Sequence, residues 1–131
     1  MDHARRYARS QNETASPERL MVLLFEAAVR HMRVGASALD AGRLSEANNA
    51  LCRATDIVTE LDATFDRPRY PELATSLGVV YGFVSQRLIA ANAGRDPRLA
   101  REAERVFLPV ADAFGEAVRK VQAERAQAEA R

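Results

Sequence analysis

The sequence predicts an all-α protein, an antiparallel up-down four-helix bundle with a flexible N-terminal arm. Apolar residues recur at spacings of three and four along four separate stretches, which is the pattern of one helix face. Short segments with proline or glycine separate these stretches, as the connections of an up-down bundle require. No stretch alternates β-branched with polar residues, and no Asn-Gly or Asp-Gly hairpin turn is present, so strands are not expected.

Length and composition limit the class of protein. The 131 residues suit one domain with one core, because domains commonly hold about 100–200 residues. A hydrophobic content of 47% excludes intrinsic disorder. The net charge of +1 provides no basic field for nucleic acid or an anionic membrane, so neither is an expected partner. Cys52 is the single cysteine and no secretory signal is recognisable, so we expect a cytoplasmic protein.

Three regions follow from the pattern along the chain. Residues 1–15 are polar and form the flexible arm, residues 16–121 form the helical bundle, and residues 122–131 form a charged tail that frays. In the arm, Arg5, Arg6 and Arg9 surround Tyr7. Charge beside an aromatic ring can bind single-stranded nucleic acid, but three arginines without a folded aromatic platform favour a polar tail.

The first two helices have recognisable ends. Ser16 followed by Pro17 is an N-cap with proline at the first helical position, and Gly42 ends the helix near Ala41. Ser45 is the expected cap of the second helix. The apolar face of that helix is predicted to comprise Ala47, Leu51, Ala54, Val58, Leu61 and Phe65.

The third helix follows a proline-containing break at 67–71 and ends near Gly94, and the fourth begins at Asp96 and Pro97. Pro109 lies inside the fourth, so we expect that helix to be kinked or split near Leu108. The predicted face of the third helix is Leu73, Leu77, Tyr81, Val84, Leu88 and Ala91. That of the fourth is Leu99, Ala103, Val106, Val110, Ala113, Ala117 and Val121.

Gly78 and Gly82 are an unusual pair inside the third helix. Each costs about 1 kcal/mol relative to alanine in a helix. Two interpretations remain open: the pair lets another backbone approach this face closely, or it has no role.

Catalytic and metal-binding patterns are not recognisable. The Glu-x-x-His motif of metal-binding bundles is missing, because Ala28 lies three residues before His31. One cysteine cannot supply a zinc site, and a Cys52–His31 nucleophile pair would lie in regular helix without a loop to form a pocket. We therefore expect no metal, no cofactor and no enzymatic activity.

The chain has more apolar side chains than a bundle interior requires. The first helix carries two adjacent apolar seams, with Val22 and Val29 at further positions around it. One seam is Leu20, Leu24, Ala27, Val34 and Ala38, and the other is Met21, Phe25, Ala28, Met32 and Leu39. The third helix adds four large apolar residues outside its main face, and the second adds Ile57. The four are Val79, Val80, Phe83 and Ile89. A surplus of this kind indicates a partner site, unless tight packing and the arm cover it.

Three motifs occur in order along the chain. Tyr7 leads to Thr14-Ala15-Ser16-Pro17 and then to the apolar start of the first helix. The segment 54–66 follows in the second helix, and the third helix holds Tyr81-Gly82-Phe83, Arg87-Leu88-Ile89 and Ala91-Asn92. Together these motifs resemble the flagellar secretion chaperones of the FliS family: the arm tyrosine with its helix start, the second helix and the third-helix signature. The resemblance extends from about Tyr7 to Val121.

The resemblance implies a small antiparallel bundle that binds the disordered C-terminal segment of flagellin in the cytoplasm. Such a chaperone prevents premature polymerisation and delivers its client to the flagellar type III export apparatus, with a component of the export gate as a further partner. Tyr7 corresponds to the family's arm tyrosine, which implies an intramolecular plug that flagellin displaces. Asn12, Ser85 and Pro109 depart from the family pattern.

We select the expected partner contacts from the surplus apolar residues and from the motifs that resemble the FliS family. They are Tyr7, Leu24, Phe25, Ile57, Val58, Leu61, Tyr81 and Phe83. An amphipathic helix of a disordered partner can lie in an apolar groove, its ordering cost offset by burial. The alternative is a helical-bundle adaptor or chaperone for a different secretion or signalling client.

Overall fold

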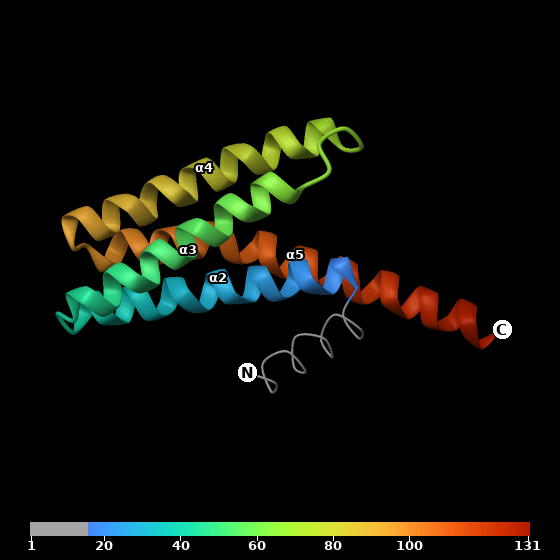
Figure 1. Cartoon of the computed structure of the whole chain (residues 1–131), viewed down its shortest axis with the longest axis horizontal. Coiled ribbons are helices and arrows are strands. Elements are labelled where there is room, and N and C mark those ends of the chain that lie inside the picture. The colour runs from blue at the N-terminus through green and yellow to red at the C-terminus, as the bar shows by residue number, and fades with distance from the viewer. Residues whose placement is uncertain (1–15) are drawn as a thin grey trace, which may run out of the picture.

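The computed structural model describes residues 16–131. Its elements are α2 (Pro17–Asp40), α3 (Leu44–Thr64), α4 (Pro71–Gly94) and α5 (Pro97–Ala130), without a strand in this part of the chain. The predictions for the arm, and for Tyr7 in particular, lie outside the described residues. The helices run side by side in alternating directions, which confirms the four-helix bundle (Figure 1).

Each helix packs against two neighbours. Helix α2 packs against α3 and α5, and α4 packs against the same two helices. Therefore α2 and α4 lie diagonally opposite each other, and their outer faces point in opposite directions. This arrangement separates the two surfaces described below.

Two predicted caps are confirmed. The Arg19 amide donates to Ser16 Oγ over 3.2 Å, and the Arg98 amide donates to Asp96 Oδ1 over 3.0 Å. Each bond satisfies one amide that has no partner within its helix. Gly42 has a φ of 72°, a left-handed conformation that glycine adopts without a steric cost, and it stops α2.

One predicted helix end was wrong and another is confirmed. Ser45 does not cap α3, because that helix begins at Leu44 with Arg43 in the cap position and no side-chain cap. The turn at Gly42 brings the Arg43 amide to Ala38 O over 2.8 Å, so the chain re-enters helix before Ser45. Helix α4 ends at Gly94 as predicted, and Arg95 caps it in the left-handed conformation with a φ of 53°.

Helix α5 is continuous through Pro109, so it is not split there, and the kink stays a prediction. Proline removes one hydrogen bond from the ladder, but aromatic packing holds the helix on both sides of that gap. The rings of Phe107 and Phe114 lie 5.5 and 5.0 Å from the ring of Phe25, measured between centroids. One buried ring on α2 therefore anchors both parts of α5.

The predicted faces are largely confirmed for α3 and partly wrong for α4 and α5. On α4, Leu73 is exposed because it lies at the end of the bundle. On α5, Ala113, Ala117 and Val121 are exposed, whereas Phe107 and Val118 are buried. The true face of α5 is rotated by about one residue from the predicted stripe.

Some of the apolar side chains predicted to exceed the needs of the bundle interior are in fact buried in the core. Val22 and Val29 of α2 are buried, so that helix packs over a wider arc than its two predicted seams. On α4 two of the extra apolar side chains are on the surface: Val79 is 71% exposed and Ile89 is 59% exposed. Among the described helices, α4 has the length and mean hydropathy sufficient to cross a membrane, by composition alone.

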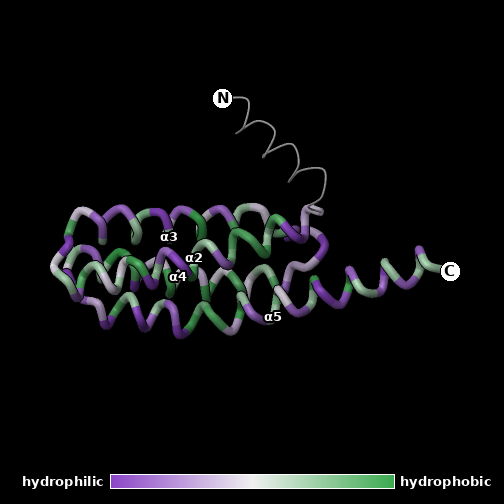
Figure 2. The backbone as a smooth tube through the Cα atoms, turned by 90° about the horizontal axis from the view of Figure 1, so that it is seen from below, coloured by the Kyte–Doolittle hydropathy of each residue, from purple (hydrophilic) through white to green (hydrophobic). Residues whose placement is uncertain are grey.

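The C-terminal turns of α5 project past the end of the bundle (Figures 1 and 2). Helix continues to Ala130, and residues 119–131 are exposed. The fraying of the tail stays a prediction. Arg125 pairs with Glu18 over 3.3 Å and fixes the base of the tail to the start of α2.

Candidate partner-binding groove

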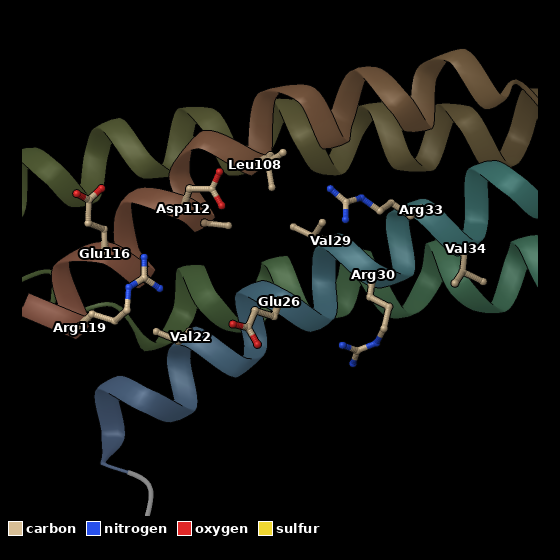
Figure 3. A pocket seen from close by; sticks show the side chains of 12 residues that line it. Val22, Glu26, Val29, Arg30, Arg33, Val34, Leu108, Asp112, Glu116 and Arg119 are labelled. Carbon is tan, nitrogen blue, oxygen red and sulfur yellow. The ribbon is translucent and has the colours of Figure 1, made fainter. Parts of the chain in front are cut away.

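A groove of about 780 Å³ lies between α2 and α5 (Figure 3). Residues 22–34 of α2 form one wall and residues 108–119 of α5 form the other. The lining residues are Val22, Glu26, Val29, Arg30, Arg33, Val34, Leu108, Ala111, Asp112, Gly115, Glu116 and Arg119. Two other cavities, of about 410 and 380 Å³, are smaller.

Ion pairs close the α2–α5 interface on both sides of this groove. At one end Arg125 lies 3.3 Å from Glu18, and at the other Arg33 lies 2.9 Å from Glu104. Beyond Arg33, Arg101 pairs with Asp40. The interface is therefore bridged at its ends and open in its middle.

The floor of the groove is apolar. Val22 and Val29 are buried on the α2 side, and Leu108 and Ala111 are half-buried on the α5 side. Gly115 has no side chain to fill the space between the walls, and an added Cβ would lie 3.5 Å from an Arg119 nitrogen. The floor can therefore bury one apolar face of an added segment.

Charged side chains line the rim, and five of them form no ion pair within residues 16–131. Three are acidic and two are basic: Glu26, Asp112, Glu116, Arg30 and Arg119. Figure 3 shows Asp112 and Glu116 on the α5 wall opposite Glu26 on α2. An apolar floor between charged rims matches an amphipathic segment with a charged outer face.

Four of the predicted contact residues lie in the core of the free chain. Phe25, Val58, Leu61 and Tyr81 are each at most 4% exposed. Burial, with a smaller effect of Asp62, raises the pKa of Tyr81 to about 12. Contact between these four side chains and a partner stays a prediction.

The other predicted contacts lie on separate surfaces. Leu24 and Ile57 are half-buried at the edge of the core. Phe83 lies on α4, where the Arg87 guanidinium covers its ring at 4.7 Å from the centroid, and Arg87 also reaches Glu102 over 3.3 Å. Sequence reasoning missed the α5 wall of the groove. Val22 and Val29 lie outside both predicted apolar seams of α2, and these two valines were the sequence signal that a further apolar contact exists on this side of α2.

Cys52 and His31, the two residues considered as a nucleophile pair, each have other neighbours. Cys52 Sγ donates to Asn48 Oδ1 over 3.7 Å, and the Asn92 amide donates to the same oxygen over 2.7 Å. Burial, with the nearby guanidiniums of Arg30 and Arg53, lowers the pKa of His31. Within residues 16–131 no three His, Cys, Asp or Glu side chains gather to hold a metal ion.

Comparison with known families decides the identity. Residues 1–121 match the sequence model of the family described as "Flagellar protein FliS". The chain belongs to the FliS family. Over 119 residues it is 28% identical to the flagellar secretion chaperone FliS of Bacillus subtilis, an alignment that covers 91% of this chain and 88% of that protein.

Other members of the FliS family show similar identity. The flagellar secretion chaperone FliS of Salmonella typhimurium is 29% identical over 102 residues, covering 77% of this chain and 76% of that protein. The flagellar secretion chaperone FliSB of Pseudomonas aeruginosa is 28% identical over 101 residues, covering 77% and 80%. The family is therefore one of chaperones for flagellar export, whose clients are flagellar proteins.

Proposed function

We propose that this chain is an export chaperone that binds the disordered C-terminal segment of flagellin in the cytoplasm. It keeps that segment from polymerising prematurely and hands the subunit to the flagellar type III export apparatus, where an export-gate component is a further partner. It acts by binding and not by catalysis. Membership of the FliS family supports the flagellar client, and the groove between α2 and α5 supports the mode of binding.

The groove between α2 and α5 is the main support for the proposed mode of client binding. Residues 22–34 of α2 span about 18 Å at 1.5 Å per residue, which is the length of about three helical turns. Burial of apolar surface on that floor offsets the cost of ordering a disordered segment. The charged rim fixes the orientation of the segment, because each wall offers charges without an ion pair in the described chain.

The arm supplies a competitor for the groove. Residues 5–9 hold three arginines around Tyr7, and the groove rim holds Glu26, Asp112 and Glu116. The arm ends at residue 15, about two helical turns before Val22 at the groove's edge. We place Tyr7 on the apolar floor in the free chain, so that flagellin must displace it.

The remaining contact candidates extend the path of a client that wraps around the bundle. Leu24, Ile57 and Phe83 are partly exposed and can contact it directly. Phe25, Val58, Leu61 and Tyr81 become contacts in a client-bound form whose helices have separated.

Co-purification tests the client. The chain is mixed with its cognate flagellin and with a flagellin that lacks roughly its last forty residues, a length suited to a wrapped helical contact. We expect retention of the full protein and loss of the truncated one. Equal retention of both would contradict the proposal and would favour an adaptor for a different secretion or signalling client.

A further inference from the structure

The outer face of α4 differs from every other outer face of the bundle in lacking charge. Of the 24 residues of α4, only Glu72 and Arg87 are charged, whereas α2 carries six charged residues over the same length. Thr75, Val79, Gly82, Gln86, Ile89 and Ala93 are all exposed and uncharged. We call these six residues the α4 seam.

The α4 seam has the spacing of a coiled-coil interface. Its members follow one another at intervals of 4, 3, 4, 3 and 4 residues, so they form one stripe along the helix. Val79 and Ile89 are the two most exposed large apolar side chains among the described residues. Among residues 16–131 nothing lies within 4 Å of where a Gly82 Cβ would be, so no described backbone segment approaches that glycine.

The α4 seam is complementary to itself in the antiparallel direction. When two copies are paired head to tail about a twofold axis, Val79 lies opposite Ile89 and Thr75 opposite Ala93. Gly82 then lies opposite Gln86, so the longest side chain of the seam faces the one seam position that has no side chain. This alternation of a and d positions is the layer pattern of an antiparallel coiled coil.

The charges at the two ends of α4 also favour antiparallel pairing of two copies. Glu72 lies at the first turn of α4 and Arg95 directly follows its last turn; both are exposed and neither forms an ion pair within residues 16–131. Antiparallel pairing brings Glu72 of each copy near Arg95 of the other, and the opposed helix dipoles agree with it. Parallel pairing would place like charges together.

We propose that a second copy of this chain docks on the α4 seam to form an antiparallel, twofold-symmetric dimer. Because α4 lies diagonally opposite α2, the groove between α2 and α5 stays open in both subunits. The dimer therefore presents two outward-facing grooves. This inference goes beyond the proposed function and stands without it.

Sedimentation of the full chain across a range of concentrations tests the dimer. We expect reversible dimerisation, and Val79→Glu should weaken it by about tenfold or more, because the two copies would bury like charges in one interface. Leu44→Glu is the matched control, since Leu44 is exposed but lies outside the seam. A monomer at every concentration, or equal weakening by both variants, would overturn the proposal. Circular dichroism shows that each variant retains its helices.

Disulfide trapping tests the direction of pairing. In a Cys52→Ser background, Thr75→Cys is mixed with Ala93→Cys, and we expect the cross-link to join one variant to the other. Cross-linking of Thr75→Cys to itself would show parallel pairing and contradict the proposal. A monomer whose seam instead binds lipid vesicles or flagellin, with binding lost in Val79→Glu, would contradict it too.

Discussion

Gly35 of α2 lies directly against Leu51 of α3, and the contact leaves no room for a side chain at position 35. A Cβ added to Gly35 would lie 2.5 Å from Leu51 Cδ2 and 2.8 Å from Leu51 Cγ. Leu51 is fully buried, so it cannot move aside into solvent. The absence of a side chain at position 35 sets how closely α2 and α3 approach each other.

We predict opposite effects for the same substitution at two glycines. Gly35→Ala should lower the free energy of unfolding by about 1–3 kcal/mol, because it overpacks the α2–α3 contact. Gly82→Ala should raise it by about 1 kcal/mol, because alanine favours helix and position 82 is open. Urea denaturation at low protein concentration measures both. A stabilising Gly35→Ala would show that α2 and α3 are farther apart than described.

Phe107 should be among the most costly core residues to truncate. It is fully buried, and its ring packs against Phe25 at 5.5 Å and Tyr81 at 6.3 Å between centroids. Phe107→Ala should lower the free energy of unfolding by about 3–5 kcal/mol. Val121→Ala, on the stripe that the sequence predicted, should change it by less than about 0.5 kcal/mol. Similar losses for both variants would contradict the observed face of α5.

Pro109 should be replaceable with a gain in stability. It is exposed inside a continuous helix and cannot donate a backbone hydrogen bond to the preceding turn. Proline in a helix interior lowers the free energy of unfolding by about 3 kcal/mol, and it raises that free energy by about 1 kcal/mol because it restricts the unfolded chain. Pro109→Ala should therefore raise the free energy of unfolding by about 2 kcal/mol, measured by urea denaturation. Loss of stability would mean that α5 needs the proline for its course along the core.

His31 should make the fold less stable in mild acid. Burial and the guanidiniums of Arg30 and Arg53 hold the pKa of His31 below its ordinary value of 6.5. Between the lowered pKa and 6.5 the unfolded chain binds more protons than the folded chain, so stability falls as the pH drops through this window. His31→Gln should show a smaller fall than wild type when urea midpoints at pH 7.5 and pH 5.5 are compared. An equal fall in both proteins would remove His31 as a contributor.

The sequence predicted much of the fold because the deciding signals are local. Ser16, Gly42 and Asp96 act on their own helix ends through one hydrogen bond or one backbone conformation, and each was found. Pro109 does not split α5, because its local cost is offset by the packing of Phe107 and Phe114 against α2, which the α5 sequence alone does not show.

The candidate site was harder to predict because it depends on the rotation of two helices about their own axes. A shift of one residue turns a helix face by about 100°. The predicted stripe of α5 was displaced by that amount, so its groove wall of Leu108, Ala111 and Gly115 was not recognised. The predicted contacts Phe25, Val58, Leu61 and Tyr81 lie on apolar faces, and sequence alone does not say which apolar face is covered by a neighbouring helix.

The most direct test of the proposed groove is the affinity of a labelled peptide from the flagellin C-terminus for two matched variants. Val34 and Val121 are both 39% exposed, but only Val34 lines the groove. Fluorescence anisotropy should show that Val34→Glu weakens binding by about tenfold, because it places a charge on the apolar contact, while Val121→Glu binds like wild type. Equal affinity of the two variants would contradict the account, since the client would then bind elsewhere on the bundle.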